Sequence, residues 1–225
     1  MGQTIELEAK DGFLVSAYEA APHAMHHRGG LVIVQEIFGV NEHIRRVADG
    51  YADDGYYVVA PAIFDRDGPG IELDYGQDGI AAGRASVEKI GMEAMLLDID
   101  AARAAAASAG KVGIAGYCLG GSLAWLAATR LHGFAAASCF YGGRIAAAAG
   151  EKPHCPVQMH FGDKDQSIRL ADVEKIRENV PPRLVEIFVY PAGHAFNRDV
   201  GASWEPNSAK LARERSVKLF KENVG

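Results

Sequence analysis

The segment Gly-Tyr-Cys-Leu-Gly-Gly at residues 116–121 constrains the fold of this chain more than any other stretch of its sequence. The largely apolar residues 111–115 before it predict a short buried strand, and residues 122–130 after it predict a helix. Cys118 therefore falls in a tight turn between a strand and a helix, with a glycine two positions away on each side. This is the pattern of a nucleophile elbow, in which the nucleophile adopts a strained backbone conformation and the glycines avoid clashes with neighbouring backbone.

Cys118 also has interpretations that give it no catalytic role. A cysteine beside a strand is often a core residue, because cysteine is among the most buried residue types. Glycines after a strand can form a phosphate loop, but neither G-x-G-x-x-G nor the Walker pattern occurs at this turn. The strand, the turn and the helix are in register for an elbow, which favours the nucleophile. A position at a helix N-terminus would also favour the thiolate, since the helix dipole stabilises negative charge there.

The rest of the chain alternates between strand and helix patterns from residue 31 onward. This alternation predicts an α/β fold with a mostly parallel central sheet and helices on both faces. Two strand patterns flank Asp11-Gly12 and predict an N-terminal antiparallel hairpin at the edge of that sheet. Residues 65–79 are rich in glycine and aspartate and predict a loop long enough to be functional. We expect strands at 4–8, 13–18, 31–34, 56–60, 111–115, 134–140, 157–161 and 184–190, and helices at 42–54, 80–108 with a break near 91, 122–130, 168–179 and 208–223.

Length and composition narrow the classes of function. The 225 residues suit one domain that spans 1–225, and a hydrophobic content of 48% can supply its core. A net charge of −6 without a long basic run argues against a nucleic-acid partner. No apolar stretch reaches membrane-spanning length, and no signal peptide is visible. The three cysteines form no disulfide framework, which predicts a reducing cytoplasm, and no Cys/His set has the spacing of a metal site.

A thiol nucleophile needs a base, and the base needs an acceptor that orients it. His194 follows the last predicted strand, and Asp163 and Asp165 follow an earlier one. The chain order is then cysteine, aspartate, histidine, as in the α/β-hydrolase triad. Loops at the carboxyl ends of parallel strands meet at one edge, so we expect His194 to take the thiol proton and Asp165 to hold its tautomer. Asp163 is a competing acid, Asp165 could instead cap a helix, and His194 could be a loop residue without a role.

The expected oxyanion hole lies beside the thiol. One donor is the backbone N–H of Leu119, directly after the nucleophile, and the second comes from the loop after strand 31–34, most plausibly from Ile37. Glu36, next to Ile37, is an unusual neighbour for a thiol nucleophile. Its negative charge would oppose a thiolate and keep the resting thiol protonated. The alternative is that Glu36 is a surface acid or the partner of an arginine.

Three motifs resemble those of the dienelactone hydrolase (carboxymethylenebutenolidase) family: Gln-Glu-Ile-Phe-Gly-Val-Asn at 35–41, Gly-Tyr-Cys-Leu-Gly-Gly at 116–121 and Gly-His-Ala-Phe-Asn-Arg at 193–198. The resemblance extends from about residue 4 to residue 221. It implies an α/β-hydrolase fold without a large cap, a monomer and no cofactor. It also implies hydrolysis of an unsaturated lactone that carries a carboxylate, through an acyl-cysteine intermediate.

The resemblance implies roles for individual residues. Cys118, Asp165 and His194 match the family triad. Asp165, and not Asp163, falls on the family's G-x-x-D position. Glu36 matches an acid that contacts the resting thiol and moves onto an arginine when substrate binds, which helps to generate the thiolate.

Two arginines are implied in substrate binding. Arg198, four residues after His194, matches the family's carboxylate-binding arginine. A second substrate-binding arginine of the best-known members aligns with Ile80 here, and Arg84, one helical turn later, can substitute for it. The resemblance therefore implies that the substrate is a small, anionic lactone or ester. Because Ile80 stands where the best-known members have a substrate-binding arginine, the exact substrate can differ from theirs.

Two other classes of protein fit parts of this pattern. A cysteine amidotransferase-type hydrolase also has G-x-C-x-G in an elbow, but it pairs its histidine with a glutamate two residues on, where this chain has Phe196. A non-catalytic small-molecule binding protein of the same fold would have a broken triad, whereas the triad is intact in this sequence.

Overall fold

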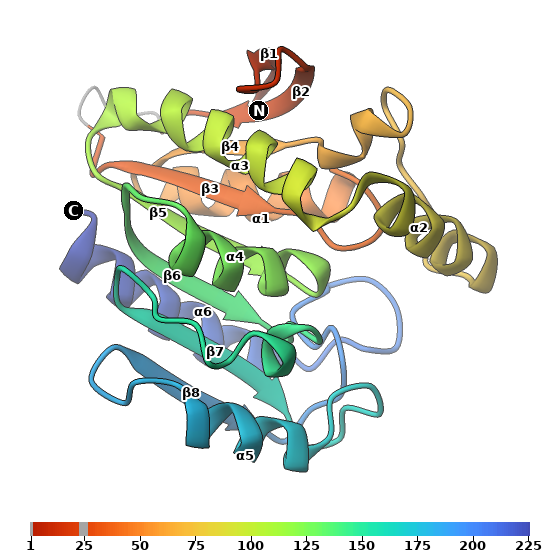
Figure 1. Cartoon of the computed structure of the whole chain (residues 1–225), viewed down its shortest axis with the longest axis vertical. Coiled ribbons are helices and arrows are strands. Elements are labelled where there is room, and N and C mark those ends of the chain that lie inside the picture. The colour runs from red at the N-terminus through yellow and green to blue at the C-terminus, as the bar shows by residue number, and fades with distance from the viewer. Residues whose placement is uncertain (1, 23–26) are drawn as a thin grey trace.

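Eight strands form one mixed sheet through the centre of the molecule (Figure 1). The computed structural model describes residues 2–22 and 27–225. The strands are β1 (Gln3–Glu8), β2 (Leu14–Ala20), β3 (Gly30–Val34), β4 (Tyr57–Pro61), β5 (Val112–Tyr117), β6 (Phe134–Phe140), β7 (Val157–Gly162) and β8 (Val185–Tyr190). They lie in the order β1-β2-β4-β3-β5-β6-β7-β8. β2 is antiparallel to both of its neighbours, and all strands from β4 to β8 in this order are parallel.

Helices cover both faces of the sheet. They are α1 (Glu42–Asp53), α2 (Gln77–Ile90), α3 (Met92–Ala106), α4 (Leu119–Arg130), α5 (Leu170–Asn179) and α6 (Pro206–Asn223), with short 3-10 turns at Ile63–Arg66, Ala107–Ala109 and Ile145–Ala147. α1 and α6 share one face, where the ring of Tyr51 meets that of Phe220 edge-on. α3 and α4 pack together over the other face (Figure 1). Among the described residues, no helix combines the length and apolar character needed to cross a membrane.

The burial of the strands follows from this layering. Every residue of β3 and of β5 is buried, because both strands lie in the middle of the sheet with helices on each face. β1 lies at an open edge, and its residues alternate between exposed and half-buried positions. The apolar runs that predicted buried parallel strands are therefore confirmed, and so is the N-terminal antiparallel hairpin.

Most predicted helices are confirmed, with shifts at their ends. Gly91, with a φ of 77°, separates α2 from α3 at the predicted break. α2 begins at Gln77, so the loop expected over 65–79 is shorter than predicted. α6 begins at Pro206, a residue that suits the first turn of a helix because it has no N–H to leave unpaired. α5 begins only at Leu170, after a turn that the buried carboxylate of Asp165 closes.

The carboxyl ends of the central strands lie at one edge of the sheet. Val34 of β3 is in register with Gly116 of β5, and Gly116 is in register with Cys139 of β6. On the far side, Gly162 of β7 is in register with Tyr190 of β8. The loops that follow these strands carry every motif singled out in the sequence, so the parallel topology gathers them at one place.

Candidate active site

Cys118 occupies the turn between β5 and α4, as the elbow pattern predicts. Its φ of 55° lies in the left-handed region that side chains rarely adopt. The turn is so crowded that a Cβ atom at Gly120 would lie 2.2 Å from the carbonyl oxygen of Val34. The backbone N–H of Cys118 donates to the carbonyl oxygen of Phe140 at 3.0 Å, which ties the elbow to the neighbouring strand. The thiol is therefore held at the first turn of α4, beside a cavity.

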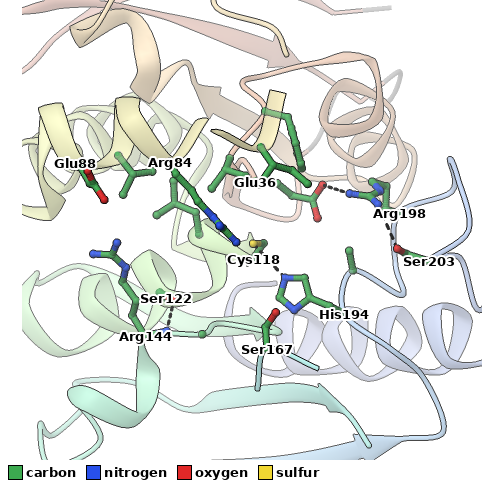
Figure 2. A pocket seen from close by; sticks show the side chains of 17 residues that line it. Glu36, Arg84, Glu88, Cys118, Ser122, Arg144, Ser167, His194, Arg198 and Ser203 are labelled. Carbon is green, nitrogen blue, oxygen red and sulfur yellow. Dashed lines mark hydrogen bonds and ion pairs between the residues drawn. The ribbon is translucent and has the colours of Figure 1, made fainter. Parts of the chain in front are cut away.

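His194 and Asp165 reach the thiol from the loops after β8 and β7. The Nε2 atom of His194 lies 3.2 Å from Sγ of Cys118 (Figure 2). The Nδ1 atom of the same ring lies 2.7 Å from Oδ2 of Asp165. The Asp165 side chain is 1% exposed, whereas that of His194 is 30% exposed and lines the cavity. The structure thus brings the three predicted residues together, with the imidazole between the carboxylate and the thiol.

Burial opposes charge on both members of this acid–base pair, but their contact outweighs it. Burial by itself would raise the pKa of Asp165, while the hydrogen bond from His194 and its charge hold that pKa below the usual value. Burial would likewise lower the pKa of His194, but the hydrogen bonds to Asp165 and Cys118 raise it to about 10. The imidazole is therefore a strong proton acceptor, and a proton taken from the thiol can rest on it at neutral pH.

The other oxygen of Asp165 shapes the turn before α5. Oδ1 accepts hydrogen bonds from the backbone N–H groups of Ser167, at 2.7 Å, and Ile168, at 3.0 Å. Asp165 therefore contacts His194 with one oxygen and closes this turn with the other. It does not cap α5, whose N-cap residue is Arg169. Asp163 is exposed, and no hydrogen bond or ion pair among the described residues joins it to His194.

The two predicted oxyanion donors belong to residues that line the cavity beside the thiol. Ile37 and Leu119 both line the cavity, and the N–H of Gly120 donates to the carbonyl oxygen of Gln35 at 3.0 Å, which ties the loop of Ile37 to the elbow. Within the described part of the chain, no hydrogen bond engages the backbone N–H of Ile37 or of Leu119. These two N–H groups are available to an oxygen that acquires negative charge.

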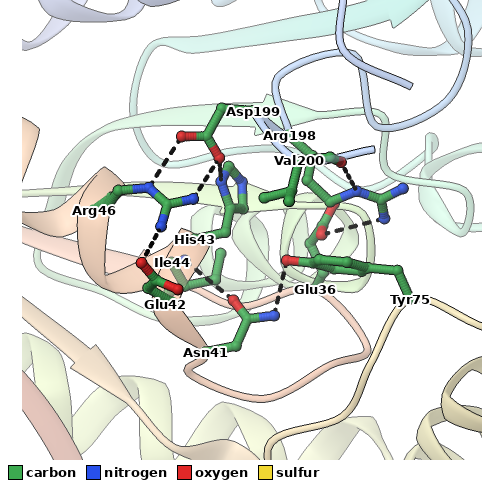
Figure 3. A network of polar contacts seen from close by, with 10 residues as sticks. All are labelled: Glu36, Asn41, Glu42, His43, Ile44, Arg46, Tyr75, Arg198, Asp199 and Val200. Atoms are coloured by element: carbon green, nitrogen blue, oxygen red, sulfur yellow. Dashed lines mark hydrogen bonds and ion pairs between the residues drawn. The ribbon is translucent and has the colours of Figure 1, made fainter. Parts of the chain in front are cut away.

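Glu36 is 1% exposed, so its interpretation as a surface acid is wrong. Neither of its carboxylate oxygens has a hydrogen-bond partner among the described residues. Oε2 lies 3.8 Å from Nη1 of Arg198, which makes Arg198 the ion-pair partner that the sequence left open (Figure 3). Burial raises the pKa of Glu36, although the positive charge of Arg198 opposes that shift. The carboxyl group is paired with Arg198 in this structure and makes no hydrogen bond to the thiol.

Arg198 lies against aromatic rings, and its side chain is only 13% exposed. The guanidinium carbon is 4.2 Å from the ring centre of Tyr75 and 5.7 Å from that of Phe38. Its Nε donates to the carbonyl oxygen of Val200 at 3.3 Å, and its Nη2 donates to the hydroxyl of Ser203 at 3.2 Å. Arg198 is therefore a half-buried residue, and its guanidinium is presented at the cavity wall.

Asp199 fastens the loop of Arg198 to α1 (Figure 3). Its carboxylate accepts hydrogen bonds from Nε and Nη2 of Arg46, at 3.0 and 2.8 Å. The same carboxylate lies 2.9 Å from Nδ1 of the buried His43. Both partners belong to α1, which begins shortly after Glu36. These bonds therefore fix the loop of Arg198 relative to the segment that carries Glu36.

Two aromatic residues of the site carried little signal in the sequence. Tyr75 belongs to the segment 65–79, which its composition and length marked only as a loop. Its hydroxyl accepts a hydrogen bond from Nδ2 of Asn41 at 3.0 Å. Tyr141 follows β6 with a φ of 39°, and its ring centre is 5.2 Å from that of His194. No motif marks either residue, because each reaches the site only through the fold.

The site opens into a cavity of about 480 Å³. Arg84 lines it from α2, and Figure 2 shows its guanidinium extending toward Cys118. Ile80, one turn earlier on α2, lines the same cavity. Arg144, which sequence reasoning missed, lines it from the loop after β6. Within residues 2–22 and 27–225, no group of three or more His, Cys, Asp or Glu side chains could hold a metal ion.

The sequence of residues 15–224 matches the model of the Dienelactone hydrolase family. The chain belongs to the dienelactone hydrolase family. This membership confirms the resemblance drawn from the three motifs, and it confirms the α/β-hydrolase fold.

Individual relatives match this chain over nearly their whole length. The carboxymethylenebutenolidase of Pseudomonas putida is 33% identical, and the match covers 95% of this chain and 93% of the relative. A candidate carboxymethylenebutenolidase of Synechocystis is 35% identical, with 93% and 92% covered. The crystal structure of a candidate dienelactone hydrolase from Klebsiella pneumoniae superposes with a TM-score of 0.85 at 32% identity, covering 98% of each chain. This member of the dienelactone hydrolase family is therefore an ester-hydrolysing enzyme.

Proposed function

We propose that this enzyme hydrolyses the ester bond of a small lactone that carries a carboxylate, through an acyl-cysteine intermediate. The observation that carries the proposal is the contact of His194 Nε2 with the Cys118 thiol at 3.2 Å, on an imidazole that the buried Asp165 orients. This arrangement supplies a nucleophile, a base and an orienting acceptor in the order that thiol catalysis needs. Family membership supports the choice of an ester bond.

The first half of the reaction acylates the enzyme. His194 accepts the thiol proton, and the thiolate of Cys118 attacks the ester carbonyl carbon. The carbonyl oxygen becomes an oxyanion, which the N–H groups of Leu119 and Ile37 stabilise. When the oxyanion collapses, the carbon–oxygen bond of the ester breaks, and His194 gives its proton to the departing oxygen. In a lactone the departing oxygen remains part of the molecule that is now a thioester of Cys118.

The second half of the reaction consumes one water molecule. His194 takes a proton from the water, whose oxygen attacks the thioester carbon. Collapse of this intermediate breaks the carbon–sulfur bond and expels the thiolate of Cys118, which recovers its proton from His194. Asp165 stays ionised throughout and holds the imidazole in one tautomer. One water molecule has been added, and a carboxylic acid is released together with the hydroxyl or enol that the first step formed.

The charged residues around the thiol support an anionic substrate. Arg198 offers a planar, bidentate match to a carboxylate at the cavity wall, and Arg84 extends toward the thiol from the other side. Glu36 is proposed to modulate the thiol, because its charge disfavours a nearby thiolate. A substrate carboxylate would compete with Glu36 for Arg198, and this competition couples substrate binding to the charge beside Cys118.

Turnover of three substrates tests this proposal against the two other classes. We expect hydrolysis of a dienelactone and of p-nitrophenyl acetate, no hydrolysis of glutamine, and loss of both ester activities after alkylation with iodoacetamide. Glutamine turnover would indicate an amidotransferase-type hydrolase instead. Binding of the lactone without any turnover would indicate a binding protein.

Replacing Glu36 with glutamine should speed the alkylation of Cys118 by iodoacetamide, because a negative charge that disfavours the thiolate is removed. Burial raises the pKa of Glu36, so the charge is present only above that pKa and the difference from wild type should grow as the pH rises. Turnover of the dienelactone should fall, since Glu36 takes part in substrate-triggered activation. Identical labelling rates and identical turnover across this pH range would remove Glu36 from the mechanism.

Replacing Arg198 with alanine should lower kcat/KM for a carboxylate-bearing lactone. The loss of a charged hydrogen bond is worth about 1.5–3 kcal/mol, or roughly tenfold to a hundredfold in kcat/KM. The loss on p-nitrophenyl acetate should be much smaller, because this ester has no carboxylate. Arg183→Ala, which removes an exposed arginine outside the cavity, is the matched control and should change neither substrate. Equal losses on the charged and neutral esters would mean that Arg198 only supports the loop of His194.

A further inference from the structure

Arg144 has no role in the proposed mechanism, yet its position is held beside the nucleophile. It follows β6, and its backbone N–H donates to the hydroxyl of Ser122 at 3.0 Å. Ser122 is 2% exposed and lies in the first turn of α4, four residues after Cys118. The Arg144 side chain lines the same cavity as the thiol. Its backbone is therefore anchored to the nucleophile's own helix, while its guanidinium faces the space where a substrate lies.

Arg144 and Arg198 approach the thiol from opposite directions. The loop of Arg198 is bonded through Asp199 to α1, on one face of the sheet, whereas Arg144 is bonded to α4, on the other face. In the view of Figure 2, Cys118 lies between the two arginines. A molecule that reaches Arg198 with one end therefore extends past the thiol toward Arg144 with the other.

The arginine and glutamate side chains that line the cavity do not balance in charge. They are Arg84, Arg144, Arg198, Glu36 and Glu88. Glu36 already lies against Arg198. Of the remaining three, two are cations, and no ion pair or side-chain hydrogen bond within the described part of the chain engages any of them. An anionic group placed against Arg144 would gain charged hydrogen bonds from its guanidinium and would displace no existing partner.

We propose that Arg144 binds a second anionic group of the substrate, so that the preferred substrates are dianions with a carboxylate on each side of the scissile ester bond. This inference rests on the proposed function, since it extends the same cavity and the same reaction. Arg198 receives one carboxylate, and Arg144 receives the other. Glu88, one helical turn after Arg84 on α2, also lines the cavity, and its negative charge repels the second carboxylate.

Matched aryl esters separate the two charges of such a substrate. The set consists of phenyl acetate, an acetate ester of 4-hydroxybenzoate, a phenyl monoester of glutaric acid, and the 4-carboxyphenyl monoester of glutaric acid. In this order, the esters carry no carboxylate, one carboxylate on the leaving group, one on the acyl group, and one on each of these two groups. In the wild-type enzyme the dianion should have the highest kcat/KM. Arg144→Gln should reduce kcat/KM for the dianion about tenfold more than for the neutral ester.

Inhibition by simple acids gives a readout that does not depend on the chemical step. Dicarboxylates of four to eight carbons should inhibit the wild-type enzyme more tightly than monocarboxylates of equal length, with a preference of about tenfold at the best length. Arg144→Gln should abolish this preference, and Arg144→Lys should restore part of it. Arg183→Gln, the matched loss of an exposed positive charge, should leave the preference intact.

Glu88→Gln distinguishes substrate binding from a contact within the protein. If Arg144 binds the substrate, then removing the negative charge of Glu88, which repels the second carboxylate, should strengthen the preference for dianions. This effect is opposite in sign to that of Arg144→Gln. Equal effects of Arg144→Gln on neutral, singly charged and doubly charged esters would overturn the inference. So would Glu88→Gln and Arg144→Gln variants that lose activity in parallel on all four esters. The proposed function fails separately, if the wild-type enzyme shows no thiol-dependent ester hydrolysis at all.

Discussion

Cys118→Ala should lose at least about a thousandfold in ester turnover while its thermal unfolding stays close to that of the wild type. The thiol is the proposed covalent centre, so no other group can form the acyl intermediate. The substitution removes only the sulfur, whose one hydrogen-bond partner among the described residues is His194. Alanine tolerates the φ of 55° no worse than cysteine does, since both carry a Cβ atom. Initial rates on p-nitrophenyl acetate and a dienelactone, with an unfolding curve for each protein, provide the measurement.

The other two cysteines supply matched controls for Cys118→Ala. Cys139 and Cys155 are both buried, and burial raises the pKa of each thiol, that of Cys155 to about 12. Neither thiol is then accessible or ionised at neutral pH. Cys139→Ala and Cys155→Ala should keep their turnover, and mass spectrometry should locate a single rapid alkylation at Cys118. Substantial activity in Cys118→Ala, or loss of activity in either control alone, would show that the nucleophile has been misassigned.

Gly116→Ala should destabilise the folded protein by about 3 kcal/mol. A Cβ atom at Gly116 would lie 1.9 Å from the carbonyl oxygen of Gly120 and 2.3 Å from its carbonyl carbon. Both belong to backbone, so the clash is relieved only if β5 moves away from the first turn of α4. For a chain of this size the loss corresponds to a fall in Tm of roughly 6–12 °C. Urea and thermal unfolding measure it directly.

Gly150→Ala is the control for Gly116→Ala. An added Cβ atom at Gly150 would meet nothing within 4 Å, and its φ does not lie in the left-handed region. Its effect should stay within about 0.5 kcal/mol. If both glycine variants are equally stable, then the elbow is not as tightly packed as the contact of Gly116 with Gly120 requires.

Short-range patterns were sufficient to predict the residues that meet at the thiol. Cys118, Asp165 and His194 each follow a strand pattern, and parallel strands place their carboxyl ends at one edge of the sheet. Prediction therefore needed only the order of strands and turns. The choice between Asp163 and Asp165 was harder, because the two acids are two residues apart in one loop. Spacing alone could not decide it, but the resemblance to the family's G-x-x-D pattern favoured Asp165, and in the structure it is Asp165 that contacts His194.

The elbow, the alternation of strands and helices and the loops that meet at the sheet edge can all be predicted from local sequence, because periodicity and glycine positions are local properties of the chain. The partners of the charged residues around the thiol, in contrast, become known only from the fold. Glu36 is buried against Arg198, and Arg198 lies on Tyr75, although these residues come from three distant segments. Arg144 belongs to no motif, and it reaches the cavity because its loop is bonded to α4. The burial and the partners of a charged side chain depend on what distant parts of the chain pack around it, and the local sequence does not contain that information.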